Sequence, residues 1–222
     1  MAEYPFIRSA RVMPKALDQF ECASYRQGKE IAATNVGPQH SISGGVCFSL
    51  CCQWIELHRE IRSGGALKRM DAMKQRIGSL KSDSIYFYRA VNSQMNTYDL
   101  SQETTKLGMK DEVGKKYGIK FENSLGDIKC IPPDYRLDDL RNEVDHTHLY
   151  TQTSFQLKKG RHAICAYKSG GKIFGMGAHL YVFDPNFGEF RVSSGEIKDF
   201  YQALFDRYKP VTSHITFKAV GI

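Results

Sequence analysis

The spacing of the apolar positions changes partway along the chain. Between Gly45 and about Arg141, apolar residues recur every three or four positions, as in amphipathic helices. Beyond His148 they form short runs rich in β-branched and aromatic residues, divided by turn sequences such as Lys-Lys-Gly and Ser-Gly-Gly. Helices followed by an antiparallel sheet predict an α+β fold, with an N-terminal helical part packed on a C-terminal sheet.

The first expected helix contains a cysteine in its first turn. It follows Ser43 as N-cap, presents apolar residues from Cys47 to Ile61 on one side and ends at Gly64-Gly65. The periodicity predicts further helices around Leu67–Ile77, Ile85–Met95, Ser101–Tyr117 and Leu137–Val144.

The second half of the chain predicts strands and one more helix. Ser193 and Glu196 form a capping-box pattern that opens a helix over Ile197–Tyr208. The expected strands are Leu149–Leu157, His162–Tyr167, Leu180–Phe183, Glu189–Val192 and His214–Val220.

Composition and charge exclude some classes of protein. With 222 residues, 41% of them hydrophobic, the chain is long enough to bury a core, and it has no linker or repeat that would divide it. No apolar stretch is long enough to cross a membrane, and the N-terminal residues lack the apolar region of a cleavable Sec signal. A signal read by a specialised secretion machine would leave no such pattern, so export by that route stays open.

The net charge favours acidic partners without indicating a nucleic-acid site. It is +7, from 31 basic and 24 acidic side chains, but the basic residues are scattered rather than clustered. Six cysteines without a CxxC pair predict a reducing compartment rather than a zinc site or a disulfide framework. The run Asp145-His146-Thr147-His148 has metal-binding residue types, but a solvated turn explains it as well, so we expect no metal and no cofactor.

Cys47 has the features of a nucleophile. In the first turn of its helix, the unpaired backbone N–H groups and the positive end of the helix dipole favour a thiolate. Gly44 and Gly45 have no side chains and leave room for a substrate backbone beside the sulfur. Cys51 and Cys52 are interpreted as small core residues.

A nucleophilic thiolate needs an imidazole and a group that orients it. His162 begins the strand sequence HAICAY, and Asp184 ends the next long strand, where Pro185 stops the ladder. His179 is the competing histidine, but it lies five residues before Asp184 on one strand, so the two side chains should point to opposite faces. A nucleophile on an N-terminal helix followed by a histidine and an acid on a later sheet is the order of papain-like cysteine proteases.

Three sequence blocks carry a closer resemblance. The segments GGVCFSLCCQWI, HAICAY and FDPNFGEF, spread from Gly44 to Phe190, resemble the motifs of the YopT/AvrPphB-type cysteine proteases, which are bacterial effectors delivered into other cells. The resemblance implies a papain-like catalytic domain over residues 41–222, preceded by a secretion segment or pro-segment over residues 1–40. It also implies Cys47 as nucleophile, His162 as general base and acid, and Asp184 as the group that orients the imidazole.

The remaining site residues depend on the same resemblance. Papain-like enzymes hold the oxyanion with the backbone N–H of the cysteine and an upstream glutamine. The usual glutamine position is Ser41 here, and the nearest glutamine, Gln39, is the expected donor. Asn186, in the Asp-Pro-Asn turn, is expected at the substrate cleft with Gly44 and Gly45, although asparagine is also ordinary in turns.

Three functions are compatible with these residues. The first is an endopeptidase that cuts a protein in the cytosol of a host or competitor cell after delivery by a specialised secretion system. The second is a glutamine or asparagine deamidase or transglutaminase, because acyl transfer from a side-chain amide needs the same groups. The third, a basic nucleic-acid-binding module, would need clustered Lys and Arg. We expect a monomer with a protein substrate, no obligatory nucleic acid, and an immunity protein or secretion chaperone as further partner.

Overall fold

The computed structural model describes residues 15–32, 47–62, 65–78, 114–115, 117–123, 126–158, 160–171 and 177–221. The strands are β1 (Glu21–Ser24), β2 (Ile119–Asn123), β3 (Ile128–Lys129), β4 (Tyr150–Leu157), β5 (Arg161–Lys168), β6 (His179–Asp184), β7 (Gly188–Ser193) and β8 (Val211–Gly221). The helices are α1 (Lys15–Asp18), α2 (Gln27–Ala32), α3 (Cys47–Glu60), α4 (Ala66–Gly78), α7 (Leu137–Val144) and α8 (Ile197–Tyr208), with the 3-10 turn η2 (Ser194–Glu196) before α8.

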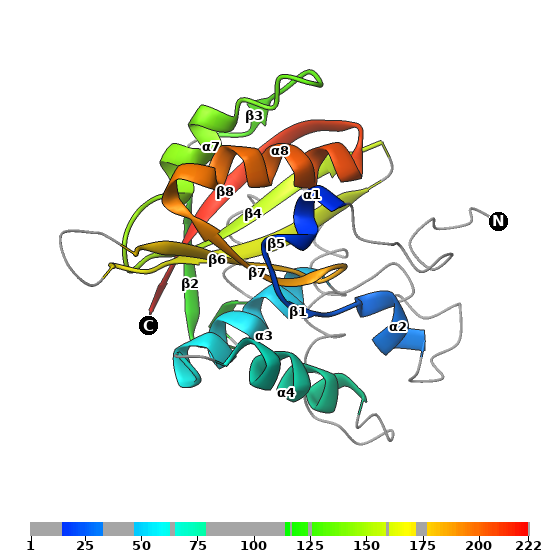
Figure 1. Cartoon of the computed structure of the whole chain (residues 1–222), viewed down its shortest axis with the longest axis vertical. Coiled ribbons are helices and arrows are strands. Elements are labelled where there is room, and N and C mark those ends of the chain that lie inside the picture. Colours follow the sequence, from blue (N-terminus) through cyan, green and yellow to red (C-terminus); the bar gives the residue numbers. More distant parts are fainter. Residues whose placement is uncertain are drawn as a thin grey trace.

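One antiparallel sheet holds the described strands together. Its order is β1-β7-β6-β5-β4-β8-β2, and β3 pairs with β8 beside this path. In Figure 1, α3 and α4 lie on one face of the sheet, and α1, α7 and α8 lie on the other. The sheet is therefore the middle layer of three.

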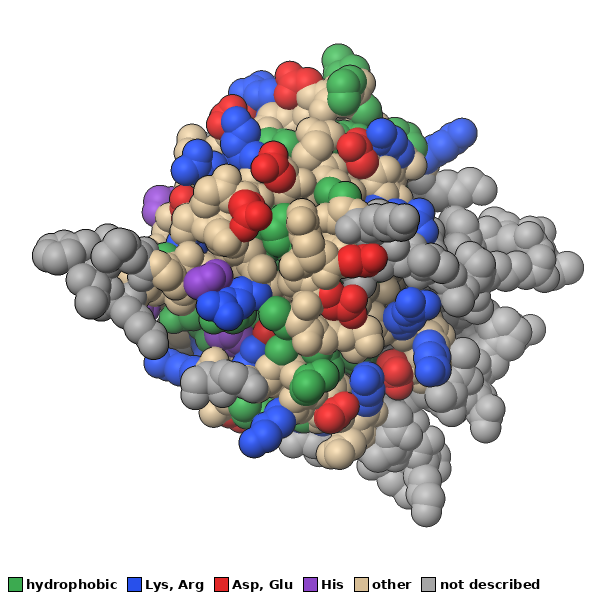
Figure 2. Space-filling model, in the orientation of Figure 1, with side chains coloured by type: hydrophobic (Ala, Val, Ile, Leu, Met, Phe, Trp, Pro, Cys, Tyr) green, Lys and Arg blue, Asp and Glu red, His purple; other side chains and the backbone are tan. Residues whose placement is uncertain are grey.

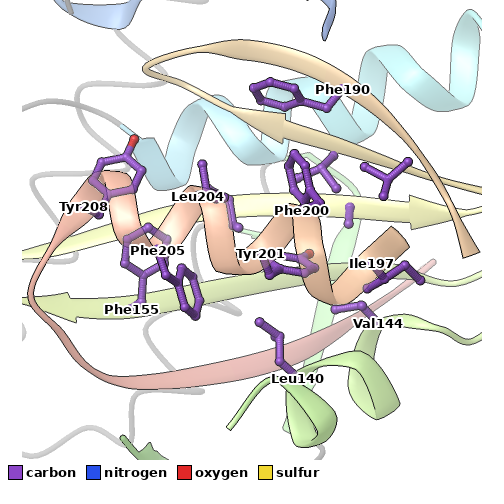
Figure 3. Close-up of a cluster of buried hydrophobic side chains, with 14 of the residues drawn as sticks. Leu140, Val144, Phe155, Phe190, Ile197, Phe200, Tyr201, Leu204, Phe205 and Tyr208 are labelled. Atoms are coloured by element: carbon purple, nitrogen blue, oxygen red, sulfur yellow. The ribbon is translucent and has the colours of Figure 1, made fainter. Parts of the chain in front are cut away.

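Both faces of β5 and β6 are buried, which explains the apolar runs Ala163–Ala166 and Leu180–Phe183 in their sequences. On β5, Ala163 and Cys165 join the core beneath α3, whereas Ile164 and Ala166 join the core beneath α8. This is the alternation that the two-residue period of a strand imposes. Figure 3 shows the second core, in which aromatic and aliphatic side chains of α8 lie along the sheet between β7 and α7.

A buried ion pair joins the layer of α3 and α4 to the sheet. The Glu189 carboxylate on β7 is fully buried and accepts hydrogen bonds from Arg69 of α4. It also accepts a 2.8 Å hydrogen bond from the indole N–H of Trp54 on α3. A buried carboxylate without such partners would strongly destabilise the fold, so these bonds fix how both helices sit on β7.

Most of the elements expected from the sequence are present where the structure describes the chain. Helices are confirmed over α3, α4, α7 and α8, and strands over β4 to β8. The capping box was wrong: neither Ser193 nor Glu196 makes a side-chain cap, because η2 intervenes before α8. Two further helices were expected. The one over Ile85–Met95 lies outside the described residues, and so does most of the one over Ser101–Tyr117. None of the described helices has the length and hydropathy that crossing a bilayer requires.

Residues 15–32 belong to the same three-layer body. The strand β1 extends the sheet beyond β7, and Leu17 and Phe20 pack in the core beneath α8. The domain boundary expected after residue 40 stays a prediction, but the part of the N-terminal segment that the structure describes packs on the sheet rather than apart from it.

Candidate active site

Cys47 is the first residue of α3. The helix packs against β5, which brings the thiol to the beginning of that strand. Its side chain is half-buried and its sulfur is within hydrogen-bonding reach of His162 and of the Ala163 backbone. The helix N-terminus adds a positive electrostatic potential at the sulfur, which favours a thiolate.

His162 and Asp184 meet because of the strand register. Cys165 of β5 pairs with Phe183 of β6 in an antiparallel ladder, so the start of β5 lies beside the end of β6. The His162 Nε2 is 3.0 Å from the Asp184 Oδ1, and both side chains are almost fully buried. With Nε2 engaged by Asp184, Nδ1 is the ring nitrogen left for Cys47.

The three side chains shift one another's protonation. Burial by itself would raise the pKa of Cys47, but the hydrogen bond and positive charge of His162, with a hydrogen bond from the Ala163 backbone, lower this pKa below its ordinary value. Burial acts to lower the pKa of His162, but the charge and hydrogen bond of Asp184, and then those of Cys47, raise it to about 9. The arrangement favours a thiolate beside an imidazolium, which is an activated nucleophile next to a proton donor.

Tyr208 is the main feature of the site that sequence reasoning missed. Its hydroxyl lies 3.1 Å from the His162 Nε2 and 3.0 Å from each Asp184 carboxylate oxygen. In the sequence it is one more aromatic residue at the end of the amphipathic helix α8, a position that normally indicates core packing. Only the tertiary structure brings it to the histidine, 46 positions away.

The Asp-Pro-Asn turn holds Asp184 from the other side. The backbone N–H of Asn186 donates to the Asp184 Oδ1 at 2.7 Å, which is an Asx-type turn contact. The Asn186 side chain donates to the Tyr208 hydroxyl at 2.8 Å and accepts from Gln27 at 2.7 Å. Gln27, in the N-terminal segment, also gave no signal in the sequence.

The other residues expected at the site lie elsewhere or are not described. Gln39, Gly44 and Gly45 fall outside the described residues. His179, the competing histidine, lies at the opposite end of β6 from Asp184, and its backbone N–H donates a hydrogen bond to the Ser169 hydroxyl.

The metal-like sequence run has a structural explanation. Asp145 pairs with the buried ammonium of Lys168, and His148 lies near the Tyr167 hydroxyl. Within the described part of the chain, no three side chains among His, Cys, Asp and Glu gather into a group that could hold a metal ion.

Comparison with known proteins gives the site its context. The cysteine proteases YopT of Yersinia pestis and of Yersinia pseudotuberculosis are each 27% identical to this chain over 164 residues, 69% of this chain and 47% of theirs. The chain therefore spans about half the length of these curated relatives. The crystal structure of the Pseudomonas avirulence protein AvrPphB matches with a TM-score of 0.67 and 17% identity, over 92% of this chain and 99% of that one.

The structural likeness confirms the expected α+β, papain-like fold. A family model described as Yersinia/Haemophilus virulence surface antigen, Peptidase_C58, matches residues 15–219, which is nearly the whole chain and includes Cys47, His162 and Asp184. The chain therefore belongs to the Peptidase_C58 family, the YopT/AvrPphB-type cysteine proteases.

Proposed function

We propose that the protein is a cysteine endopeptidase with Cys47 as nucleophile, His162 as general acid and base, and Asp184 as the group that orients the imidazole. The observation that carries this proposal is the interaction of the three side chains: the lowered pKa of Cys47 and the raised pKa of His162 both result from it. Membership of a peptidase family supports the same chemistry.

The proposed reaction has two halves. The Cys47 thiolate attacks the carbonyl carbon of the scissile peptide bond, and the imidazolium of His162 gives its Nδ1 proton to the leaving amine. A water molecule then attacks the resulting thioester while His162 accepts its proton, which releases the acid product and restores the thiolate. The Cys47 backbone N–H and Gln39 are the proposed oxyanion donors, with Gly44, Gly45 and Asn186 beside the substrate.

We further propose that the protein acts as a virulence effector inside a recipient cell, after export by a specialised secretion system. The names of the matching family, a virulence surface antigen, and of the similar avirulence protein support this setting. A secretion chaperone, or an immunity protein where the recipient is another bacterium, is a proposed partner of the chain, which we expect to act as a monomer.

The charge of the protein constrains its proposed substrate. The chain carries a net charge of +7, and Figure 2 shows Lys and Arg side chains interspersed with Asp and Glu over the visible face. A basic protein repels a basic peptide at low ionic strength. The proposed target is therefore a protein segment without a polybasic tail.

Expression of the wild type and of Cys47→Ala in bacterial and eukaryotic cytosol tests the proposed function. We expect the wild type to generate new protein N-termini, detected by N-terminal proteomics, and the alanine variant to generate none. New termini at polybasic segments would contradict the proposed substrate class. A Cys47-dependent mass change of about one unit on intact proteins, without new termini, would indicate deamidation and overturn the endopeptidase.

A further inference from the structure

The Tyr208 hydroxyl lies where four polar atoms of three side chains converge. It is within 3.1 Å of the His162 Nε2, of both Asp184 oxygens and of the Asn186 amide nitrogen. We propose that Tyr208 is a positioning residue, which holds the Asp184 carboxylate toward His162 and keeps the His162 Nε2 protonated. This inference rests on the proposed function of Cys47, but its test below does not depend on peptidase activity.

The hydrogen bonds of this hydroxyl have one consistent assignment. A phenolic hydroxyl donates one hydrogen and accepts two. The Asn186 amide can only donate from Nδ2, so it takes one lone pair of the Tyr208 oxygen. The ionised Asp184 carboxylate can only accept, so it takes the tyrosine hydrogen.

The remaining lone pair of the hydroxyl faces His162. The His162 Nε2 therefore carries its hydrogen and shares it between the Asp184 Oδ1 and the Tyr208 oxygen. With Nε2 protonated, Nδ1 is the nitrogen that exchanges a proton with Cys47. When His162 is neutral, the hydroxyl and Asp184 together favour the tautomer that keeps its hydrogen on Nε2 and leaves Nδ1 free to accept a proton.

Tyr208 also supplies a donor that Asp184 lacks otherwise. The Asp184 Oδ1 receives hydrogen bonds from His162 and from the Asn186 backbone, whereas the donor recorded for Oδ2 among the described residues is Tyr208. Asp184 is fully buried, so an oxygen without a donor is costly there. Loss of the hydroxyl should therefore let the carboxylate turn away from Nε2.

The tyrosine ring is held in place independently of its hydroxyl. It lies 4.9 Å from the His162 ring at 30°, and the rings of Phe155 and Phe187 contact it edge-on. A change to phenylalanine keeps these contacts and removes the oxygen alone. Tyr208→Phe is therefore a selective test.

A second residue extends the same chain of bonds into the N-terminal segment. Gln27, the first residue of α2, donates to the Asn186 side-chain oxygen, which leaves the Asn186 Nδ2 directed at Tyr208. The Gln27 backbone N–H also donates to the Pro185 carbonyl at 2.7 Å. Asn186→Ala should therefore weaken the tyrosine contact without altering the tyrosine itself.

The test measures the rate at which iodoacetamide alkylates Cys47 between pH 5 and 9 in purified full-length protein. The matched control is Tyr201→Phe, on the same helix, because the Tyr201 hydroxyl is buried and has no hydrogen-bond partner among the described residues. We expect Tyr208→Phe to move the alkylation profile to higher pH and to slow alkylation near pH 6 about tenfold, the size expected when a hydrogen bond to a charged group is lost. Tyr201→Phe should leave the profile unchanged.

Each outcome decides the inference separately from the peptidase proposal. A profile of Tyr208→Phe that coincides with those of the wild type and Tyr201→Phe would overturn the positioning role, whether or not the wild type cuts proteins. If circular dichroism shows that Tyr208→Phe does not fold, Asn186→Ala takes its place: a smaller shift in the same direction supports the role, and no shift overturns it. With a cleaved substrate, the expected signature is a lower kcat at nearly constant KM.

Discussion

The protonation of Cys47 can be measured against a second cysteine of the same chain. Burial alone would raise the pKa of Cys47, but hydrogen bonding and the charge of His162 lower it. Cys22 is an exposed residue, yet the partial burial of its sulfur, and then the charge of Glu189, raise its pKa. Exposure alone would make Cys22 the faster to react. We expect the reverse near pH 6.5, because only the thiolate is a nucleophile. Mass spectrometry of alkylated peptides gives both rates in one sample.

His162 is the control for this prediction. Its pKa of about 9 keeps the imidazolium protonated across neutral pH, and the thiolate of Cys47 depends on that charge. His162→Ala should therefore remove the preference for Cys47 at pH 6.5. If His162→Ala kept the preference of the wild type for Cys47, the helix N-terminus alone would be enough to activate the thiol.

In the intact enzyme, peptidase activity should fall as the pH rises through about 9, where His162 loses the proton that the leaving amine needs.

The residues of the site differ in how far the sequence could predict them. Cys47 and Asp184 are marked locally, by a glycine pair before a helix and by a proline that ends a strand. Tyr208 has no such mark, because a tyrosine on an amphipathic helix has the same pattern whether its hydroxyl serves a network or only packs. Gln27 contacts a turn 159 positions away, and no local pattern encodes that distance.

At the level of elements, Gly188 sets how closely β1 can approach β7. Its φ is +121°, which side-chain-bearing residues rarely adopt, and a Cβ there would lie 2.1 Å from the Ala23 carbonyl oxygen. Gly188→Ala must therefore push the N-terminal strand away from the sheet. We expect a loss of stability of about 2 kcal/mol or more in urea unfolding. We also expect slower Cys47 alkylation, since the chain that follows β1 holds the Asp184 turn through Gln27.

Gly195 offers a matched control for this change. A Cβ built there meets nothing within 4 Å, so Gly195→Ala should leave stability and alkylation close to those of the wild type. Equal stability of both alanine variants would show that β1 can leave the sheet without cost, which would contradict its role as an edge strand.

The strand β1 also shows what the periodicity could not predict: four residues, Glu21–Ser24, are too few to establish an alternating pattern.

Burial of both faces of the sheet also explains where helix and strand assignments agreed with the structure. The helix α8 buries one face along its whole length, so its period is clear, whereas β4 is buried on both faces and is predicted from its β-branched and aromatic residues rather than from alternation. The strand β2 has five residues and pairs with the far edge of β8, so its place depends on a contact about a hundred positions away. Pairing over such distances is a property of the whole molecule.

The stability of the whole molecule should depend on a buried histidine away from the catalytic site. His58 of α3 is buried against the Trp54 ring, its Nδ1 is 2.9 Å from the Tyr150 hydroxyl, and its Nε2 has no partner among the described residues. Burial, and then the charges of Arg69 and Arg62, lower its pKa to about 3. His58 therefore stays neutral in the folded protein at a pH where the unfolded chain already protonates it.

The sign of the resulting pH dependence follows from proton uptake. Between about pH 6.5 and 3 the unfolded state binds one more proton at His58 than the folded state does, so acid favours unfolding. We expect the free energy of unfolding to fall by about 1.4 kcal/mol per pH unit in this window from His58 alone. His214, whose pKa burial also lowers, adds to the loss in the wild type, so the His58 share must be isolated by a variant.

Urea unfolding of the wild type and of His58→Gln at several pH values between 7 and 4 isolates that share. Glutamine can still bond to the Tyr150 hydroxyl but does not titrate, so the variant should start less stable at pH 7 and lose stability more slowly as the pH falls. His146→Gln, at an exposed position, should follow the wild type. Parallel curves for the wild type and His58→Gln would mean that His58 takes up its proton equally well in the folded state, which its burial beneath the sheet argues against.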